Sequence, residues 1–332
     1  MTGFTRLFVS AATAALLAVP ALAADFTLRV HTLVQSPHPY NDIADYIKEK
    51  LEAGSDGRIA VRIFTAGQLG QDPAVISEMA LGTIDLMIST TSNGVQQIPE
   101  YAIFTMPYIF PGMDEMRADL APDSPIFKHF EQVYQDRGLG MKLLALGASG
   151  TRNVATDGVV VNGPGDLKGL KMRTPPTPMD AEVWAALGML PVTVAWGELY
   201  AAMQTGVAQA MESSLPGYDG SKLYEVAPNL ALTAHTIQVN HTSMSQASWN
   251  KLPEDLQQLV WDVAQEANQH GIDMALKYDS ELVESLIAEH NVSVTRPDKQ
   301  EFIAILGPVQ EKLAQDLDLV EEYQIIQAAV AD

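Results

Sequence analysis

One arginine at the end of an apolar segment is the group in this sequence best suited to bind an anion. Arg173 lies in the segment Gly169-Leu170-Lys171-Met172-Arg173-Thr174-Pro175-Pro176. The two prolines lack an amide donor and have a fixed φ, and a residue that precedes proline favours an extended backbone, so a strand should end just after Arg173. A guanidinium keeps its charge and offers a planar fork of donors that matches a carboxylate. The sequence therefore predicts an organic-anion site, with pairing of Arg173 to a structural Asp or Glu as the alternative.

Other polar and aromatic side chains also follow predicted strands, where α/β sheets bind ligands. Arg152 comes after the apolar run 141–146 and adds a second cation, unless it forms a salt bridge between two lobes. Trp196 precedes a predicted helix that begins near residue 198, and its indole either covers a ligand or belongs to the core. Short hydroxyl and amide groups, with one carboxylate, complete the candidate binding set: Asn93 after the predicted strand 83–88, and Glu212 and Ser213 at the end of the predicted strand 207–212.

Sequence patterns typical of catalysis and metal binding are absent. The chain has no His-Glu-x-x-His, Gly-x-Ser-x-Gly or Walker motif, and no Gly-x-Gly-x-x-Gly after a strand. His235 and His241 form the only near pair of histidines, and no acidic residue is spaced to complete a zinc site, so we expect a binding role for one of the two and neither metal nor cofactor. The alternative to a receptor is a periplasmic enzyme that acts on an organic acid, with His38 or Glu212 as acid or base.

Composition and the first residues indicate where the protein works. Residues 1–24 combine Arg6 with the apolar run 7–17 and Ala21-Leu22-Ala23, a pattern typical of a secretory signal peptide and too short for a membrane anchor. The chain has no cysteine, which excludes a lipid-modified cysteine and disulfides, so we expect a free periplasmic protein. A formal net charge of −21 argues against nucleic acid as a partner, and any anionic ligand must be held by specific arginines.

Hydrophobic patterning predicts an α/β fold with two lobes. Strand and helix patterns alternate first over 26–31, 41–51, 58–64, 73–81 and 83–88, and again over 141–148, 159–161, 170–173, 179–187, 198–205 and 207–212. An alternating order of this kind favours largely parallel sheets flanked by helices. Helical spacing from Pro253 past Tyr278 to Ile287 predicts a helix on the order of 50 Å long, which exceeds one lobe and is expected to span both.

Taken in order, several segments resemble the substrate-binding proteins of tripartite ATP-independent periplasmic (TRAP) transporters of the DctP type. The resemblance covers nearly the whole chain after residue 24 and is carried by Gly57-Arg58-Ile59, Gln68-Leu69-Gly70, Leu81-Gly82-Thr83-Ile84-Asp85, Asp166 to Pro175, Glu198-Leu199-Tyr200, Gln204-Thr205-Gly206 and Trp249-Asn250-Lys251-Leu252-Pro253. It implies a fold like that of periplasmic binding proteins, with two α/β lobes around a cleft, several chain crossings and a long helix across both lobes. The lobes expected are 25–148 plus about 235–272, and 149–234 plus about 273–332.

The same resemblance implies a function and roles for three residues. Arg173 matches the arginine that grips the ligand carboxylate, Arg152 matches a second cationic position, and Trp196 matches an aromatic residue that packs on the ligand. The receptor is then expected to be a monomer that closes on an organic acid and delivers it to a membrane permease driven by an ion gradient. A ligand-binding partner of a sensor protein is the alternative to transport.

Two departures from the family pattern bear on the ligand. The chain has Ala210-Met211-Glu212-Ser213 where many members have Gly-Gln-Glu-Asn, and Gln71-Asp72-Pro73 where a basic residue often follows Gln-Leu-Gly. Fewer groups then remain to satisfy a heavily oxygenated acid, while Trp196, Met211 and Tyr218 are expected to make the pocket more apolar. The sequence thus favours a monocarboxylate with an apolar or aromatic body over a sialic acid or a dicarboxylate.

Overall fold

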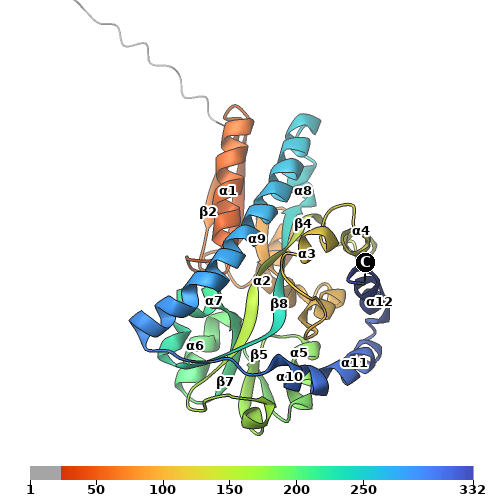
Figure 1. Cartoon of the computed structure of the whole chain (residues 1–332). Helices are drawn as coiled ribbons and strands as arrows, with labels where there is room; N and C mark the ends of the chain where they lie inside the picture. The colour runs from red at the N-terminus through yellow and green to blue at the C-terminus, as the bar shows by residue number, and fades with distance from the viewer. Residues whose placement is uncertain (1–23, 332) are drawn as a thin grey trace, which may run out of the picture.

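The computed structural model describes residues 24–331, so the expected signal peptide lies outside the described residues. Two α/β lobes are joined by long elements that run through both (Figure 1). The strands form a sheet in the order β2-β1-β3-β8-β4-β7-β5-β6, with β9 paired to β8. The predicted α/β class and two-lobe architecture are confirmed.

The first lobe begins with three parallel strands, because helices return the chain to the same edge each time. The strand β1 (Phe26–Thr32) pairs in parallel with β2 (Ile59–Phe64) on one side and β3 (Leu86–Thr90) on the other. The connections are α1 (Pro39–Gly54) and α2 (Asp72–Ala80), both with proline in the first turn, where its missing amide costs no helical hydrogen bond. The polar ends of β1 and β3 therefore face the second lobe.

The second lobe repeats this arrangement with shorter strands. The strand β5 (Lys171–Thr174) pairs in parallel with β6 (Leu190–Thr193) and with β7 (Ala210–Ser214). Helices α5 (Pro178–Ala186) and α6 (Leu199–Gln204) connect these strands, and α7 (Leu215–Gly220) follows β7. Residues 159–161, expected as a strand, lie in a loop, since no strand is assigned between β4 and β5.

Two long antiparallel strands cross between the lobes. The strand β4 (Met141–Thr156) pairs with β7 of the second lobe, β8 (Asn229–Ser245) pairs with β3 of the first, and the two pair with each other. The sequence predicted that β4 would end before Gly150, but that glycine adopts φ 117° at an irregularity in the pairing and the strand continues. Arg152 consequently lies within a strand and not at a strand end, which corrects the sequence interpretation.

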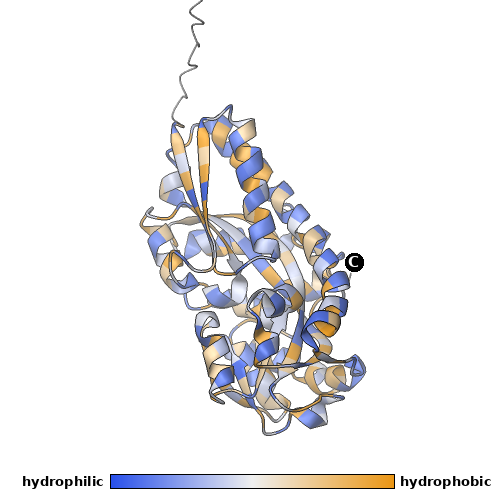
Figure 2. Cartoon of the chain, turned by 90° about the vertical axis from the view of Figure 1, so that its left-hand side faces the viewer, coloured by the Kyte–Doolittle hydropathy of each residue, from blue (hydrophilic) through white to orange (hydrophobic). Residues whose placement is uncertain are grey.

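A single long helix also runs through both lobes. The helix α9 (Glu254–His290) has 37 residues and is about 55 Å long, which confirms the prediction. It contacts α1 and β4, and further along it contacts α7. In Figure 2, blue and orange residues alternate around the helices, as expected where one face packs on the sheet and the other faces water.

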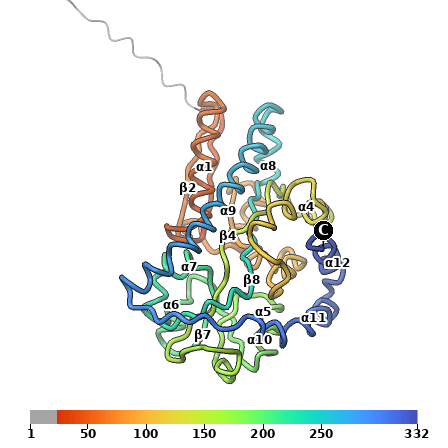
Figure 3. Tube along the Cα trace, in the orientation of Figure 1, coloured from red at the N-terminus to blue at the C-terminus, as the bar shows by residue number. Residues whose placement is uncertain are grey.

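The elements after α9 pack first on the second lobe and then lead the chain back to the first. After α9 the chain passes through β9 (Ser293–Thr295), α10 (Lys299–Leu306) and α11 (Gln310–Asp316) to α12 (Val320–Ala329), which lies beside α4 (Pro125–Asp136) in Figure 3. The short helices α3 (Met116–Asp119) and α8 (Gln246–Trp249) flank β4. The lobe boundaries given above stay a prediction. They assign α12 to the second lobe, whereas α12 contacts α4, which they assign to the first.

Candidate functional site

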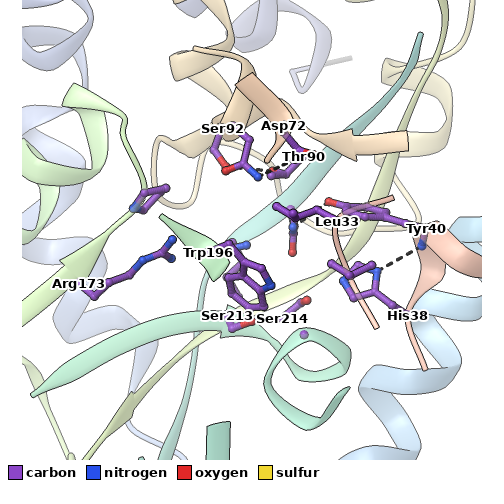
Figure 4. A pocket seen from close by; sticks show the side chains of 16 residues that line it. Leu33, His38, Tyr40, Asp72, Thr90, Ser92, Arg173, Trp196, Ser213 and Ser214 are labelled. Carbon is purple, nitrogen blue, oxygen red and sulfur yellow. Dashed lines mark hydrogen bonds between the residues drawn. The ribbon is translucent and has the colours of Figure 1, made fainter. Parts of the chain in front are cut away.

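A pocket lies between the two lobes, where strand ends from both converge. Its empty volume is about 420 Å³. The first lobe contributes side chains from the ends of β1, β3 and the starts of α1 and α2, and the second contributes the ends of β5 and β7 (Figure 4). The lining comprises Leu33, Val34, His38, Tyr40, Asp72, Thr90, Ser92, Asn93, Arg152, Arg173, Pro175, Trp196, Ser213, Ser214, Gly217 and Gln238.

Arg173 is buried in this pocket without a protein carboxylate. Its residue is 1% exposed, and its Nε donates to the Val194 carbonyl oxygen at 2.9 Å, which fixes the plane of the guanidinium. Within residues 24–331 no Asp or Glu oxygen lies within 4.0 Å of it, and its terminal nitrogens donate to no protein atom. Burial lowers the pKa of Arg173 to about 10, so it is still a cation at neutral pH. In the described residues Arg173 is therefore not paired with a structural Asp or Glu, which was the alternative that the sequence left open.

Arg152 does have a carboxylate partner, in contrast. Its Nη2 donates to Glu212 Oε1 at 2.6 Å and its Nε donates to the other carboxylate oxygen, which makes a bidentate pair between β4 and β7. Burial alone would raise the pKa of Glu212, but Arg152 and His235 outweigh it, so its pKa is held well below its usual range. Glu212 does not line the main pocket, but it contacts Arg152, which does. The structure thus brings both predicted arginines to the pocket but leaves only Arg173 unpaired.

Trp196 forms one wall beside the free arginine. The Arg173 guanidinium carbon lies 5.8 Å from the centre of the indole ring, a cation–π contact. Opposite the ring lies Gly217, which sequence reasoning missed. A Cβ at this position would lie 2.7 Å from the Ser213 hydroxyl and 3.3 Å from the indole, so glycine allows the close approach of α7.

The first-lobe wall presents polar groups that are already oriented by hydrogen bonds. The Asn93 amide nitrogen donates to Asp72 Oδ2 at 2.7 Å, and the Gln238 amide nitrogen donates to the Tyr40 hydroxyl at 2.8 Å. Within residues 24–331 the carbonyl oxygens of both amides accept no hydrogen bond, and that of Gln238 is buried. Asp72 also accepts from His31 Nε2 at 2.9 Å.

Several of these residues were not predicted, and the reason differs among them. Asp72 attracted notice only as a departure from the family pattern, while Tyr40 and Gln238 gave no sequence signal of their own. His38 was considered as an acid or base, but its Nδ1 accepts from the Tyr40 amide at the start of α1. Burial, and then Arg152, lower the pKa of His38 to about 3, so it is neutral at physiological pH.

Three residues expected at the pocket lie in the core instead. Tyr218 is 1% exposed and its hydroxyl donates to the Ala227 carbonyl oxygen at 2.6 Å, because its face of α7 packs on the second lobe. His241 is fully buried beside Ser243, with Nδ1 2.7 Å from its hydroxyl. Met211 is likewise in the core of the second lobe. In the part of the chain that the structure describes, no three potential ligands are grouped to hold a metal.

Residues 30–316 match the sequence model of the bacterial extracellular solute-binding protein family 7, DctP. The chain belongs to this family. A solute-binding protein from Sulfitobacter sp. (strain NAS-14.1) is 29% identical over 97% of this chain and 98% of its own length. The family consists of substrate-binding receptors of TRAP transporters, so this DctP-type chain is a receptor and not an enzyme.

Solved structures of this family share the whole fold. The TRAP periplasmic solute-binding protein of Bradyrhizobium sp. BTAi1, in complex with D-galacturonate, superimposes with a TM-score of 0.83 at 27% identity, over 91% of this chain and 99% of its own. That of Bordetella bronchispeptica, with density interpreted as pantoate, gives a TM-score of 0.84 at 27% identity, over 92% and 98%. The family is periplasmic, and among residues 24–331 no helix is long and apolar enough to cross a bilayer.

Proposed function

We propose that this DctP-type receptor captures a small organic acid by pairing its carboxylate with Arg173. The observation that carries the proposal is a buried, charged guanidinium whose terminal nitrogens face a pocket and have no partner in the described chain. A buried charge is costly unless it is paired, so the open pocket favours an anion with two coplanar oxygens. The receptor then passes the acid to a TRAP permease, acting as a monomer.

Charge pairing in the pocket favours an acid with one carboxylate. Arg152 is already neutralised by Glu212, so only Arg173 is available to a ligand carboxylate. A second carboxylate would be desolvated without a cation to compensate it. D-Galacturonate and pantoate, which were found in the two related proteins, each carry a single carboxylate together with hydroxyl groups.

We propose a ligand body with one apolar side and one hydroxylated side. The sequence favoured an apolar or aromatic body because of three residues, of which only Trp196 lines the pocket. Trp196, Leu33 and Val34 offer apolar surface, whereas the carbonyl oxygens of Asn93 and Gln238 are acceptors that match hydroxyl donors. We therefore expect the ligand to present an apolar surface only to the wall formed by Trp196, Leu33 and Val34.

The proposal is tested by isothermal titration calorimetry with D-galacturonate and pantoate on the wild type and on Arg173→Ala. Loss of the guanidinium leaves the ligand carboxylate buried and unpaired, so affinity should fall by about 100-fold or more. Arg58→Ala is the matched control, because Arg58 is exposed and pairs with Asp255 far from the pocket. Near-normal affinity in Arg173→Ala would refute the assignment.

A further inference from the structure

A second buried carboxylate lies close to the arginine pair, in a position that the sequence did not single out. Asp180 is in the first turn of α5 and is 8% exposed. It lines a small chamber with an empty volume of about 310 Å³. The chamber adjoins the main pocket, since both are lined by Thr90, Ser92, Arg152, Pro175 and Gln238.

Asp180 has no partner that would compensate its charge. Among residues 24–331, Oδ2 of Asp180 is buried without any hydrogen-bond partner and no cationic nitrogen lies within 4.0 Å of the carboxylate. The side chain of Thr105 is the neutral neighbour that favours the anion. Arg152, the arginine that shares the chamber, pairs with Glu212 through its Nε and Nη2. The site therefore contains two groups of opposite charge that are not in contact with each other, Arg173 and Asp180.

Binding of an acid would satisfy one of these charges and isolate the other. A ligand carboxylate on Arg173 cancels the positive charge that partly stabilises the Asp180 anion. The same carboxylate adds a negative charge to a closed, water-poor site. A buried carboxylate that loses a favourable neighbour and gains a like charge is neutralised by a proton.

We propose that Asp180 is a ligand-linked proton site, so that the receptor takes up one proton from solvent on Asp180 when a carboxylate binds Arg173. The proton forms an O–H bond on the Asp180 carboxyl, and the net charge of the site is then the same before and after binding. This inference rests on the proposed function, because it requires the ligand carboxylate at Arg173.

The groups around Asp180 support a proton affinity in the physiological range. Burial and then Glu212 raise the pKa of Asp180 to about 7, against the opposing effects of Arg152 and Arg173. The other elements packed on α5 add little charge. The strand β5 carries the exposed Lys171 besides Arg173, and β6 has no charged side chain. Glu100 of the segment 99–105 pairs with Arg137, α10 carries Lys299 and Glu301, and His235 of β8 lies near Glu212.

The test is isothermal titration calorimetry of the full receptor with D-galacturonate and pantoate in Tris and in HEPES at equal ionic strength, at pH 6 and pH 8. Neither acid carries an ammonium group that could replace the proton. The buffers differ in ionisation enthalpy, so the difference in apparent binding enthalpy gives the protons taken up. We expect uptake near zero at pH 6, approaching about one proton per ligand at pH 8, with affinity falling up to about tenfold per pH unit in between.

Asp180→Asn imitates the protonated residue and should bind with an affinity that does not change with pH and without proton uptake. Asp279→Asn is the matched control, since the half-buried Asp279 also has one buried, unpartnered oxygen but lines neither the pocket nor the chamber. Binding without proton uptake in the wild type, or uptake that persists in Asp180→Asn, would overturn this inference and leave the proposed function standing. If neither acid binds, nor acetate at high concentration, the proposed function fails and this inference fails with it.

Discussion

At the scale of single residues, the difference between the two pocket arginines decides what the site can bind. Both guanidiniums are buried, but Arg152 is held by Glu212 and Arg173 is held only by a backbone carbonyl and an indole. The bidentate pair of Arg152 and Glu212 carries no net charge, and Arg152 still forms part of the pocket wall. One arginine is thus held by a carboxylate, and the other is the proposed anion receptor.

Glu212→Gln should therefore weaken the fold and change the ligand preference. Removing one partner of a buried pair leaves the other charge uncompensated, which costs about 3 kcal/mol of unfolding free energy. The freed Arg152 then offers a second cation, so succinate, a dicarboxylate probe, should gain affinity relative to D-galacturonate. Urea unfolding and calorimetry measure the two effects.

Glu182→Gln serves as the control for Glu212→Gln, because Glu182 is an exposed acid on α5. It should change neither stability nor preference. Wild-type stability in Glu212→Gln would mean that the ion pair contributes nothing net to the fold. An unchanged preference would mean that Arg152 stays out of reach of the ligand.

At the scale of helices and strands, sequence reasoning was accurate where local chemistry decides the structure. The strand that carries Arg173 was predicted because Pro175 and Pro176 limit the backbone locally, and α9 was predicted because its apolar spacing is regular. The strand β8 was missed because Asn240, His241, Thr242 and Ser243 are polar yet 0% exposed, so no alternating pattern marks it. Long-range pairing, and not local preference, makes this segment a strand.

The same limit explains which parts of the site were predicted. Arg152 and Glu212 were both candidates, but their pairing depends on the register of β4 against β7, which shifts at irregularities. Asp180 gave no signal, because an acid in the first turn of a helix is ordinarily a favourable surface residue. Asp180 is a buried charge only because the packing of α5 places it near Arg152 and Arg173.

The docking of α12 onto α4 provides a pH-dependent contact at this scale. His129 Nε2 lies 2.8 Å from Glu322 Oε1, and this hydrogen bond raises the pKa of His129 above its ordinary 6.5. Its stabilising contribution is fully present below that ordinary value and is lost as pH rises through the raised value. Both side chains are mostly buried, so we expect this charge-assisted hydrogen bond to contribute about 1 kcal/mol.

Hydrogen exchange in α12, corrected for the intrinsic rate, should accordingly be faster at pH 8 than at pH 6. His129→Ala should abolish the difference. His270→Ala is the control, since His270 stacks on Tyr46 in another part of the first lobe. Equal protection of α12 at both pH values in the wild type would show that this pair does not hold the helix.

At the scale of the whole molecule, the proposed function requires the two lobes to separate, so that a ligand from solvent can reach the buried Arg173, and then to close on it. The elements that cross between lobes are β4, β8 and α9, and bending within them allows the lobes to separate without breaking the sheet. The pocket then opens, and its walls come together again around the acid. Charge pairing and exclusion of water are thus completed in one step.

The net charge of the molecule opposes the approach of such a ligand. The chain carries a formal charge of −21, whereas the compensating cation is a single buried arginine. Over distances longer than the screening length, about 10 Å at 0.1 M salt, an organic anion is repelled. Salt screens this repulsion, so the association rate constant for D-galacturonate or pantoate should rise with ionic strength, while the dissociation rate from the closed pocket should change little. Stopped-flow fluorescence measures both rates, because Trp196 lies on the pocket wall. An association rate that falls with salt would show instead that the arginines at the open cleft dominate the field that the ligand meets.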